Sequence, residues 1–150
     1  MKQELYNYIF ELDFKVRDYE CDLQGIVNNA VYQNYLEHTR HEFLRTSGND
    51  FAQMHQQGVN PVVIKSELEY KAPLTSGDEF TVKLALRRIN YVKFQFIENI
   101  YLKNSGKLIL NGLITCAVTM NGRPVKIDIL PPAIYQLMEN NEDISPVKKK

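Results

Sequence analysis

The stretch that decides the fold of this chain is RDYECDLQGIVNNAVYQNYLEHTR, residues 17–40. In its second half, Tyr32, Tyr35 and Leu36 recur at the i, i+3, i+4 spacing of one helix face. The first half lacks this period, and it contains Gly25, a residue type that tight turns favour. The stretch therefore predicts a turn that leads into an amphipathic helix.

Strands are predicted on both sides of this helix. Residues 6–17 alternate between apolar and polar side chains, which is typical of a long strand with one buried face. From Pro61 to Met120, four further alternating runs are separated by turn residues. We expect tight turns to join these four strands into an antiparallel sheet, with the helix packed across its concave face. A change of phase near Glu98 predicts a β-bulge.

Glycine and proline residues predict the limits of the shorter elements. Gly48 is expected to end the principal helix as its left-handed cap, and a short second helix should cover residues 49–57. A proline pair predicts a C-terminal helix over residues 132–140, followed by a disordered tail at 141–150. Gly112, inside the last strand, indicates either a sharp bend or the close approach of another backbone.

Length and composition indicate one ordinary globular domain. The chain has 150 residues, of which 44% are hydrophobic and 24% charged. We expect that domain to occupy residues 1–140. The formal net charge is zero, so no overall field attracts nucleic acid or an anionic membrane. No apolar run approaches the roughly 18 residues of a membrane helix, and the N-terminus lacks a signal-like segment, so we expect a cytoplasmic protein.

The two cysteines, Cys21 and Cys116, match no metal or redox spacing. We expect both to be reduced thiols, because free cysteine commonly behaves as a small buried hydrophobe. The position of Cys21 next to Asp22 leaves a nucleophilic role open. Such a role needs a base, however, and no histidine is near Cys21 in sequence.

The histidines of the principal helix do not predict a metal site. His38 and His41 are three residues apart, which would suit a metal pair only if a third ligand faced them. We expect packing or solvated histidines, and neither a metal nor an organic cofactor. Glu37 and Arg40 are also three apart and predict an ion pair on the helix surface or at an interface.

The start of the helix has the best potential for chemistry. If Asn28 is the N-cap, its side chain accepts the amide of Ala30 or Val31 and leaves the Asn29 amide without an intrahelical partner. A directed donor of this kind is worth about 10²–10³ in rate at a developing oxyanion. Asp22 precedes the helix by about six residues and could act from the other side of a bound carbonyl, as base or nucleophile. The ordinary alternatives are a turn role for Asp22 and simple capping for the two asparagines.

The same stretch, YECDLQGIVNNAVYQNYLEHTR, closely resembles the start of hotdog-fold acyl-CoA thioesterases of the 4-hydroxybenzoyl-CoA thioesterase-like group. The family turn Asp-x-x-Gly-(Ile/His/Val)-Val is matched here by Asp22, Gly25, Ile26 and Val27. The family helix Tyr-x-x-(Tyr/Phe)-Leu-(Glu/Asp)-x-x-Arg is matched by Tyr32, Tyr35, Leu36, Glu37 and Arg40. EYKAPLTSGDEF, residues 69–80, resembles the strand and turn before the family's third strand, and the order of elements agrees over residues 6–120.

The resemblance implies an α+β fold, a single hotdog domain in which an antiparallel five-stranded sheet wraps around a long central helix. It also implies a homodimer with the active site between subunits, and such dimers often pair into homotetramers. Asp22 would be the catalytic carboxylate, and the Asn29 backbone amide would bind the thioester carbonyl. The implied substrate-binding residues are Gly25, Ile26, Val27, Asn28 and Tyr32.

The asparagine pair at 28–29 is more similar to members that act on fatty acyl thioesters than to members that act on aromatic ones. We therefore expect hydrolysis of a fatty acyl-CoA to the free acid and CoA. An acyl-carrier-protein thioesterase is an alternative, and so is a non-catalytic acyl-thioester binding protein on the same fold. A hotdog dehydratase is less compatible, because no histidine is paired with an acidic residue in a comparable turn.

Overall fold

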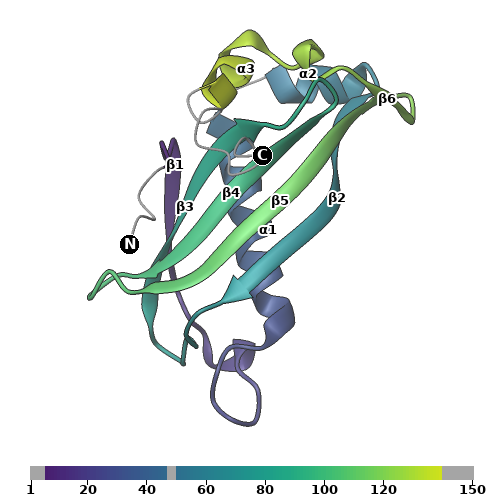
Figure 1. Cartoon of the computed structure of the whole chain (residues 1–150). Helices are drawn as coiled ribbons and strands as arrows, with labels where there is room; N and C mark the ends of the chain where they lie inside the picture. The colour runs from purple at the N-terminus through teal and green to yellow at the C-terminus, as the bar shows by residue number, and fades with distance from the viewer. Residues whose placement is uncertain (1–5, 47–49, 140–150) are drawn as a thin grey trace.

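The structure, a computed structural model, describes residues 6–46 and 50–139 (Figure 1). In chain order the elements are β1 (Phe10–Lys15), a 3₁₀ turn η1 (Asp18–Glu20), α1 (Asn29–Thr46), α2 (Asp50–Gln56), β2 (Val59–Tyr70), β3 (Glu79–Arg88), β4 (Lys93–Leu102), β5 (Leu108–Met120), β6 (Arg123–Val125), η2 (Ile127–Ile129) and α3 (Pro132–Glu139). The strands form one antiparallel sheet in the order β1-β3-β4-β5-β2, and the short β6 pairs with β5. Helix α1 runs behind this sheet in Figure 1. The predicted α+β class, with one antiparallel sheet wrapped around a long helix, is confirmed, and β6 is an addition.

The core lies between α1 and one face of the sheet. Alternate residues of β3, β4 and β5 contribute to this core, and the buried residues of α1 are Tyr32, Tyr35, Leu36, Thr39 and Phe43. Phe14 of β1 stacks on Phe80 of β3 with ring centroids 5.1 Å apart, and Tyr35 packs against Phe80 at 4.8 Å. The amphipathic period of the helix therefore corresponds to its observed buried face.

The predicted series of four strands joined by tight turns is wrong at one connection. β3–β4 and β4–β5 are hairpins, but β2 pairs with β5 at one edge, while β3 pairs with β1 near the other. The link at residues 71–78 instead passes the turn that precedes α1, where the Val27 amide donates to the Leu74 carbonyl at 2.9 Å. A turn signal in sequence marks where a strand ends but does not identify the strand with which it pairs.

The first strand is shorter than predicted, because it begins at Phe10 and not at residue 6. The hydroxyl of Tyr8 lies 2.9 Å from the Tyr101 hydroxyl and accepts a hydrogen bond from the Asn99 side chain at 2.7 Å. Tyr8 therefore leaves the apolar row of the predicted strand. The reason is chemical, since a phenol hydroxyl favours polar partners over the core.

The predicted bulge is present in this part of the sheet, but it does not lie at Glu98. Glu98 stays in register opposite Gly112, and its side chain is fully buried on the same face as Phe96 and Ile100. The register shifts of the sheet lie instead between Ile100 and Tyr101 in β4 and between Val63 and Lys65 in β2. The apparent change of phase in the sequence arises because a charged residue, Glu98, lies within a row of buried apolar residues.

Arg40 explains how Glu98 is accommodated. The Arg40 guanidinium donates to Glu98 Oε1 at 2.8 Å from the buried face of α1, so the predicted Glu37–Arg40 pair is wrong. Glu37 lies instead 3.7 Å from His41 on the helix surface. Burial raises the pKa of Glu98 to about 8, and the neighbouring Arg40 opposes that rise.

Gly112 is required by close approach, one of its two predicted roles. A Cβ at this position would lie 2.9 Å from the Glu98 backbone oxygen and 3.1 Å from Leu36 of the helix. The positions of α2 and α3 match the predicted second and C-terminal helices. The predicted cap at Gly48 and the predicted tail at 141–150 lie outside the described residues. No helix in the described ranges is long and apolar enough to cross a membrane.

Candidate active site at the start of the central helix

The turn before α1 is organised by the Asp22 side chain. Asp22 Oδ1 accepts the Gln24 amide at 2.8 Å and the Ile26 amide at 3.4 Å. The Asp22 amide in turn donates to the Ile26 carbonyl at 2.9 Å, and Gly25 takes a φ of +83°, which favours glycine. The turn role weighed for Asp22 is thus observed. The side chain is exposed, and its second oxygen, Oδ2, makes no hydrogen bond to the described part of the chain.

The helix start has the predicted capping geometry. Asn28 Oδ1 accepts the Ala30 amide at 3.0 Å, and the Asn28 carbonyl accepts the Val31 amide at 2.9 Å. The Asn28 amide is tied to the Glu20 carbonyl at 3.0 Å. Asn29 is the first helical residue, and its backbone amide has no acceptor among residues 6–46 and 50–139. This amide is therefore available to a ligand oxygen.

A cleft of about 330 Å³ lies beside this amide, and we call it the helix-start cleft. It is lined by Ile26, Val27, Asn29, Tyr32, Tyr70, Lys71, Ala72 and Pro73. Four of the predicted site residues are brought together there, namely Ile26, Val27, Asn29 and Tyr32. Asp22, Gly25 and Asn28 are not part of its lining and lie in the turn and cap just before it.

Two tyrosines form an aromatic wall of the cleft. The Tyr32 hydroxyl accepts the Leu74 amide at 3.2 Å, and its ring makes an edge-on contact with Tyr70 at 5.3 Å. Burial is the main reason that the pKa of Tyr32 is raised. Tyr70, at the end of β2, is 48% exposed, and Lys71 Nζ lies 3.2 Å from Glu69.

Tyr70 and Lys71 were not predicted as site residues, although both lie in the 69–80 stretch that resembles the family. Nothing in the local pattern relates this stretch to the helix start, about 40 residues earlier in the chain. The contact is made by the 71–78 link, in which Thr75 bridges to Ile26. Tyr70 therefore depends on the crossing of two distant segments for its place in the cleft.

Cys21 is not favoured as the nucleophile by its surroundings. Its pKa is raised by burial first and then by nearby carboxylates, of which Asp18 has the largest effect. Burial likewise raises the pKa of Cys116 to about 12. Both thiols are free, as predicted. Across the described ranges no group of three or more His, Cys, Asp or Glu side chains is arranged to hold a metal ion.

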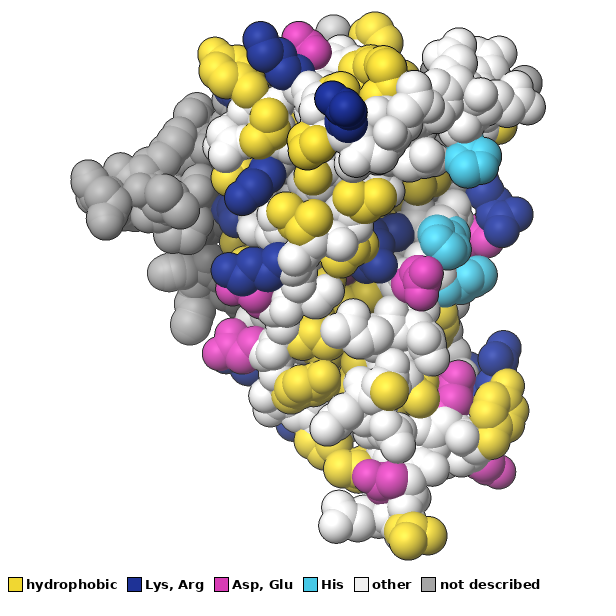
Figure 2. All heavy atoms as spheres, turned by 90° about the vertical axis from the view of Figure 1, so that its right-hand side faces the viewer, with side chains coloured by type: hydrophobic (Ala, Val, Ile, Leu, Met, Phe, Trp, Pro, Cys, Tyr) yellow, Lys and Arg dark blue, Asp and Glu magenta, His cyan; other side chains and the backbone are white. Residues whose placement is uncertain are grey.

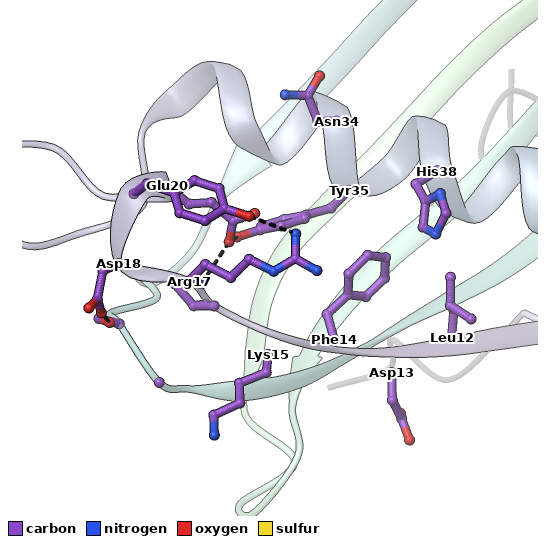
Figure 3. A pocket seen from close by; sticks show the side chains of 14 residues that line it. Leu12, Asp13, Phe14, Lys15, Arg17, Asp18, Glu20, Asn34, Tyr35 and His38 are labelled. Atoms are coloured by element: carbon purple, nitrogen blue, oxygen red, sulfur yellow. Dashed lines mark hydrogen bonds between the residues drawn. The ribbon is translucent and has the colours of Figure 1, made fainter.

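A second and larger cleft, of about 920 Å³, lies between β1, the loop at 17–20 and α1 (Figure 3). None of the predicted site residues lines it. It is called the β1 cleft below. The two clefts differ in position: the helix-start cleft includes the end of edge strand β2, whereas the β1 cleft borders the opposite edge of the sheet.

An antiparallel sheet around one long helix, with a free amide at the helix start and an aspartate in the preceding turn, defines the class as hotdog proteins of the thioesterase type. Residues 16–137 match the model of the thioesterase-like superfamily, and the chain belongs to that family.

Curated relatives and a solved structure agree with this assignment. The chain is 36% identical over 118 residues to the chloroplastic acyl-acyl carrier protein thioesterase ATL3 of Arabidopsis thaliana, which covers 78% of this chain and 62% of ATL3. It is 30% identical over 105 residues to the long-chain acyl-CoA thioesterase FadM of Escherichia coli, covering 70% of this chain and 79% of FadM. A crystal structure of a hypothetical protein from Aquifex aeolicus superposes with a TM-score of 0.74 at 29% identity, covering 87% of this chain and 99% of that one.

Proposed function

We propose that this protein hydrolyses fatty acyl-CoA thioesters to the free acid and CoA. The observation that carries the proposal is the unpaired Asn29 amide at the start of α1, which opens into a mainly apolar cleft directly after the Asp22 turn. Membership of the thioesterase-like superfamily and the similarity to FadM support this reaction class. The proposed reaction needs no metal or organic cofactor.

In the proposed reaction the thioester carbonyl oxygen accepts the Asn29 amide, which stabilises the negative charge that develops there. Asp22 then takes a proton from a water molecule, and the water oxygen attacks the carbonyl carbon. The C–S bond breaks, and the departing thiolate recovers the proton from Asp22. In the other version of the reaction, an Asp22 oxygen attacks the carbonyl carbon, and the C–S bond breaks as the CoA thiolate leaves. Water then hydrolyses the resulting mixed anhydride to the free acid and the Asp22 carboxylate, and the thiolate takes up the proton that this step releases.

The lining of the cleft favours an apolar acyl group. Val27, Tyr32 and Tyr70 provide hydrophobic or aromatic surface next to the Asn29 amide. Gly25 and Ile26 shape the turn at the mouth, and Asn28 holds the amide in place through the helix cap. A fatty acyl chain needs this kind of surface and no polar partner beyond the carbonyl.

The free edge of β2 supports a homodimer as part of the proposal. The apolar residues Val62, Val63, Ile64 and Tyr70 are exposed along this strand. Figure 2 shows hydrophobic side chains gathered down the face that carries this edge. A second copy that adds its β2 antiparallel to this one would cover them and place the helix-start cleft beside the partner. Pairing of two such dimers would give the homotetramer, and both assemblies, like the cytoplasmic location, stay predictions.

An acyl-carrier-protein substrate is the second candidate, because ATL3 carries that activity in its name. Comparison of kcat/KM for one acyl group presented on CoA and on carrier protein distinguishes the two. We expect the CoA ester to be the better substrate. A substrate preference of tenfold or more for the carrier protein would instead favour the second candidate.

The reaction itself is tested by thiol release across acyl-CoA chain lengths, with wild type and Asp22→Asn. Asparagine keeps the oxygen that accepts the Gln24 and Ile26 amides, so the turn is preserved while the base or nucleophile is removed. We expect a loss of about 10²-fold or more in kcat. Asp128→Asn, an exposed aspartate remote in sequence, is the matched control and should retain wild-type activity.

The same assay can contradict the proposal. Absence of turnover by wild type on every thioester, with retained acyl-thioester binding, would favour the non-catalytic binding protein. Equal activity of Asp22→Asn and wild type would exclude Asp22 from the chemistry.

A further inference from the structure

The β1 cleft has the size and lining of a small-molecule site but no part in the proposed reaction. Its volume of about 920 Å³ lies within the range of ligand pockets, roughly 300–1,000 Å³. Leu12 and Phe14 of β1 and Tyr35 of α1 form apolar walls, and Phe14 contacts the His38 ring at 5.9 Å. Figure 3 shows Leu12 and Phe14 directed toward the helix, whereas Lys15 and Asp13 point away from the cleft.

The carboxylates around the cleft have partners of their own. Glu20 Oε1 accepts the Tyr35 hydroxyl at 2.7 Å and the Arg17 amide at 2.9 Å. Asp18 accepts the Ser76 hydroxyl. Asp13 accepts the Thr81 hydroxyl at 2.7 Å and Lys103 Nζ at 2.9 Å, and these bonds lower its pKa. Each acidic group in the lining is therefore already engaged with the protein.

Arg17 is different, because most of its donors are free. Its Nη1 donates to the Tyr19 hydroxyl at 3.0 Å, and its Cζ lies 5.9 Å from the Tyr19 ring. Its Nε and Nη2 donate to no acceptor in the part of the chain that the structure describes. Figure 3 shows the guanidinium reaching along the cleft toward Phe14, below the Tyr35 ring. One anchored nitrogen and two free donors form a preoriented fork of the kind that binds carboxylate or phosphate.

Taken together, these features lead us to propose that the β1 cleft is a second ligand site for an anionic amphipath, with its carboxylate or phosphate on Arg17 and its apolar body against Leu12, Phe14 and Tyr35. His38, on the helix side of the cleft, supplies a further polar group at the rim. Both a fatty acid and the phosphate-bearing part of a coenzyme carry this chemistry. The site stands independently of the proposed hydrolysis, since no residue is shared with the helix-start cleft.

Isothermal titration calorimetry with dodecanoate, its neutral analogue dodecanol, and free CoA tests this assignment. We expect wild type to bind dodecanoate or CoA, with dodecanol at least tenfold weaker than dodecanoate. Arg17→Met should lower by tenfold or more the affinity for the anion that binds, because charge-assisted hydrogen bonds are lost. Lys15→Met is the matched control, since it removes a neighbouring cation that points away from the cleft, and its affinity should equal that of wild type. Whichever anion responds to Arg17→Met identifies the source of the charged group.

A blocking variant separates the two clefts. Asn34→Trp places a large side chain at the rim of the β1 cleft and should abolish binding of the anion. This variant tests the site independently if Arg17→Met does not fold. Tyr70→Ala alters only the helix-start cleft, where products of the proposed reaction can also bind, and should leave the part of the affinity that depends on Arg17 unchanged. The proposal is overturned if neither anion binds wild type, or if binding is lost in Tyr70→Ala and retained in Arg17→Met and Asn34→Trp.

Discussion

Two carboxylates lie close to α1, Asp22 in the turn that precedes it and Glu98 in β4, where it pairs with Arg40 of the helix. Their surroundings are opposite. Asp22 is exposed, and it uses one oxygen for two backbone amides while the other faces solvent. Glu98 is fully buried, with one oxygen on Arg40 and a second oxygen, Oε2, that has no hydrogen-bond partner within the described residues. The difference shows that position decides what a carboxylate can do. Asp22 can meet a substrate, whereas Glu98 is a structural group whose protonation is tied to folding.

The largest expected effect comes from breaking the buried pair. At pH 9, where Glu98 is largely ionised, Arg40→Met should lower the free energy of unfolding by about 3 kcal/mol or more, because the buried carboxylate loses its counter-charge and its hydrogen bond. The loss should be smaller at pH 6, where the Glu98 carboxyl is already mostly protonated and loses only the hydrogen bond. Urea unfolding followed by circular dichroism measures both values. Arg45→Met, on the exposed side of the same helix, should change stability by no more than about 0.5 kcal/mol.

A second prediction concerns pH. The pKa of Glu98 is about 8 in the folded protein, above the ordinary glutamate value of 4.5, so the folded state binds the proton more tightly than the unfolded state. The resulting stabilisation is complete below about pH 4.5 and is lost as the pH rises through about 8. The expected slope is at most about 1.4 kcal/mol per pH unit.

Comparison with Glu98→Gln isolates this contribution. Glutamine resembles the protonated carboxyl but does not titrate, so the variant should lack this part of the pH dependence. Unfolding free energies of both proteins at pH 5, 6, 7 and 8 provide the measurement. Parallel curves for the two proteins would show that Glu98 does not titrate in this range.

The smallest effect should come from Asp22. Asp22→Asn keeps the turn acceptor on an exposed side chain, so its unfolding free energy should stay within about 0.5 kcal/mol of wild type. Together with the loss of hydrolysis proposed above, this would separate reactivity from stability at one residue. A thermal melt of the two proteins is sufficient. A clear drop in Tm for Asp22→Asn would mean that the charge itself holds the turn.

Local features of the fold and site could be predicted well from sequence. The cap at Asn28, the turn at Gly25 and the span of α1 depend on residues within a few positions of one another. Features that depend on a distant partner could not. Tyr70 enters the helix-start cleft only because the 71–78 link crosses the turn, and Arg17 matters only because β1 and α1 leave a cleft between them.

Residues 17–40 by themselves determined a turn, a capped helix and an amide left free at the helix start, because neighbouring residues in the chain set the backbone hydrogen bonding there. The tertiary structure alone decided the sheet order, the partner of Arg40 and the location of the two clefts. Arg40 meets Glu98 across 58 residues of sequence. Contacts of that range are selected by packing the whole core, so the spacing of residues along the chain does not reveal them.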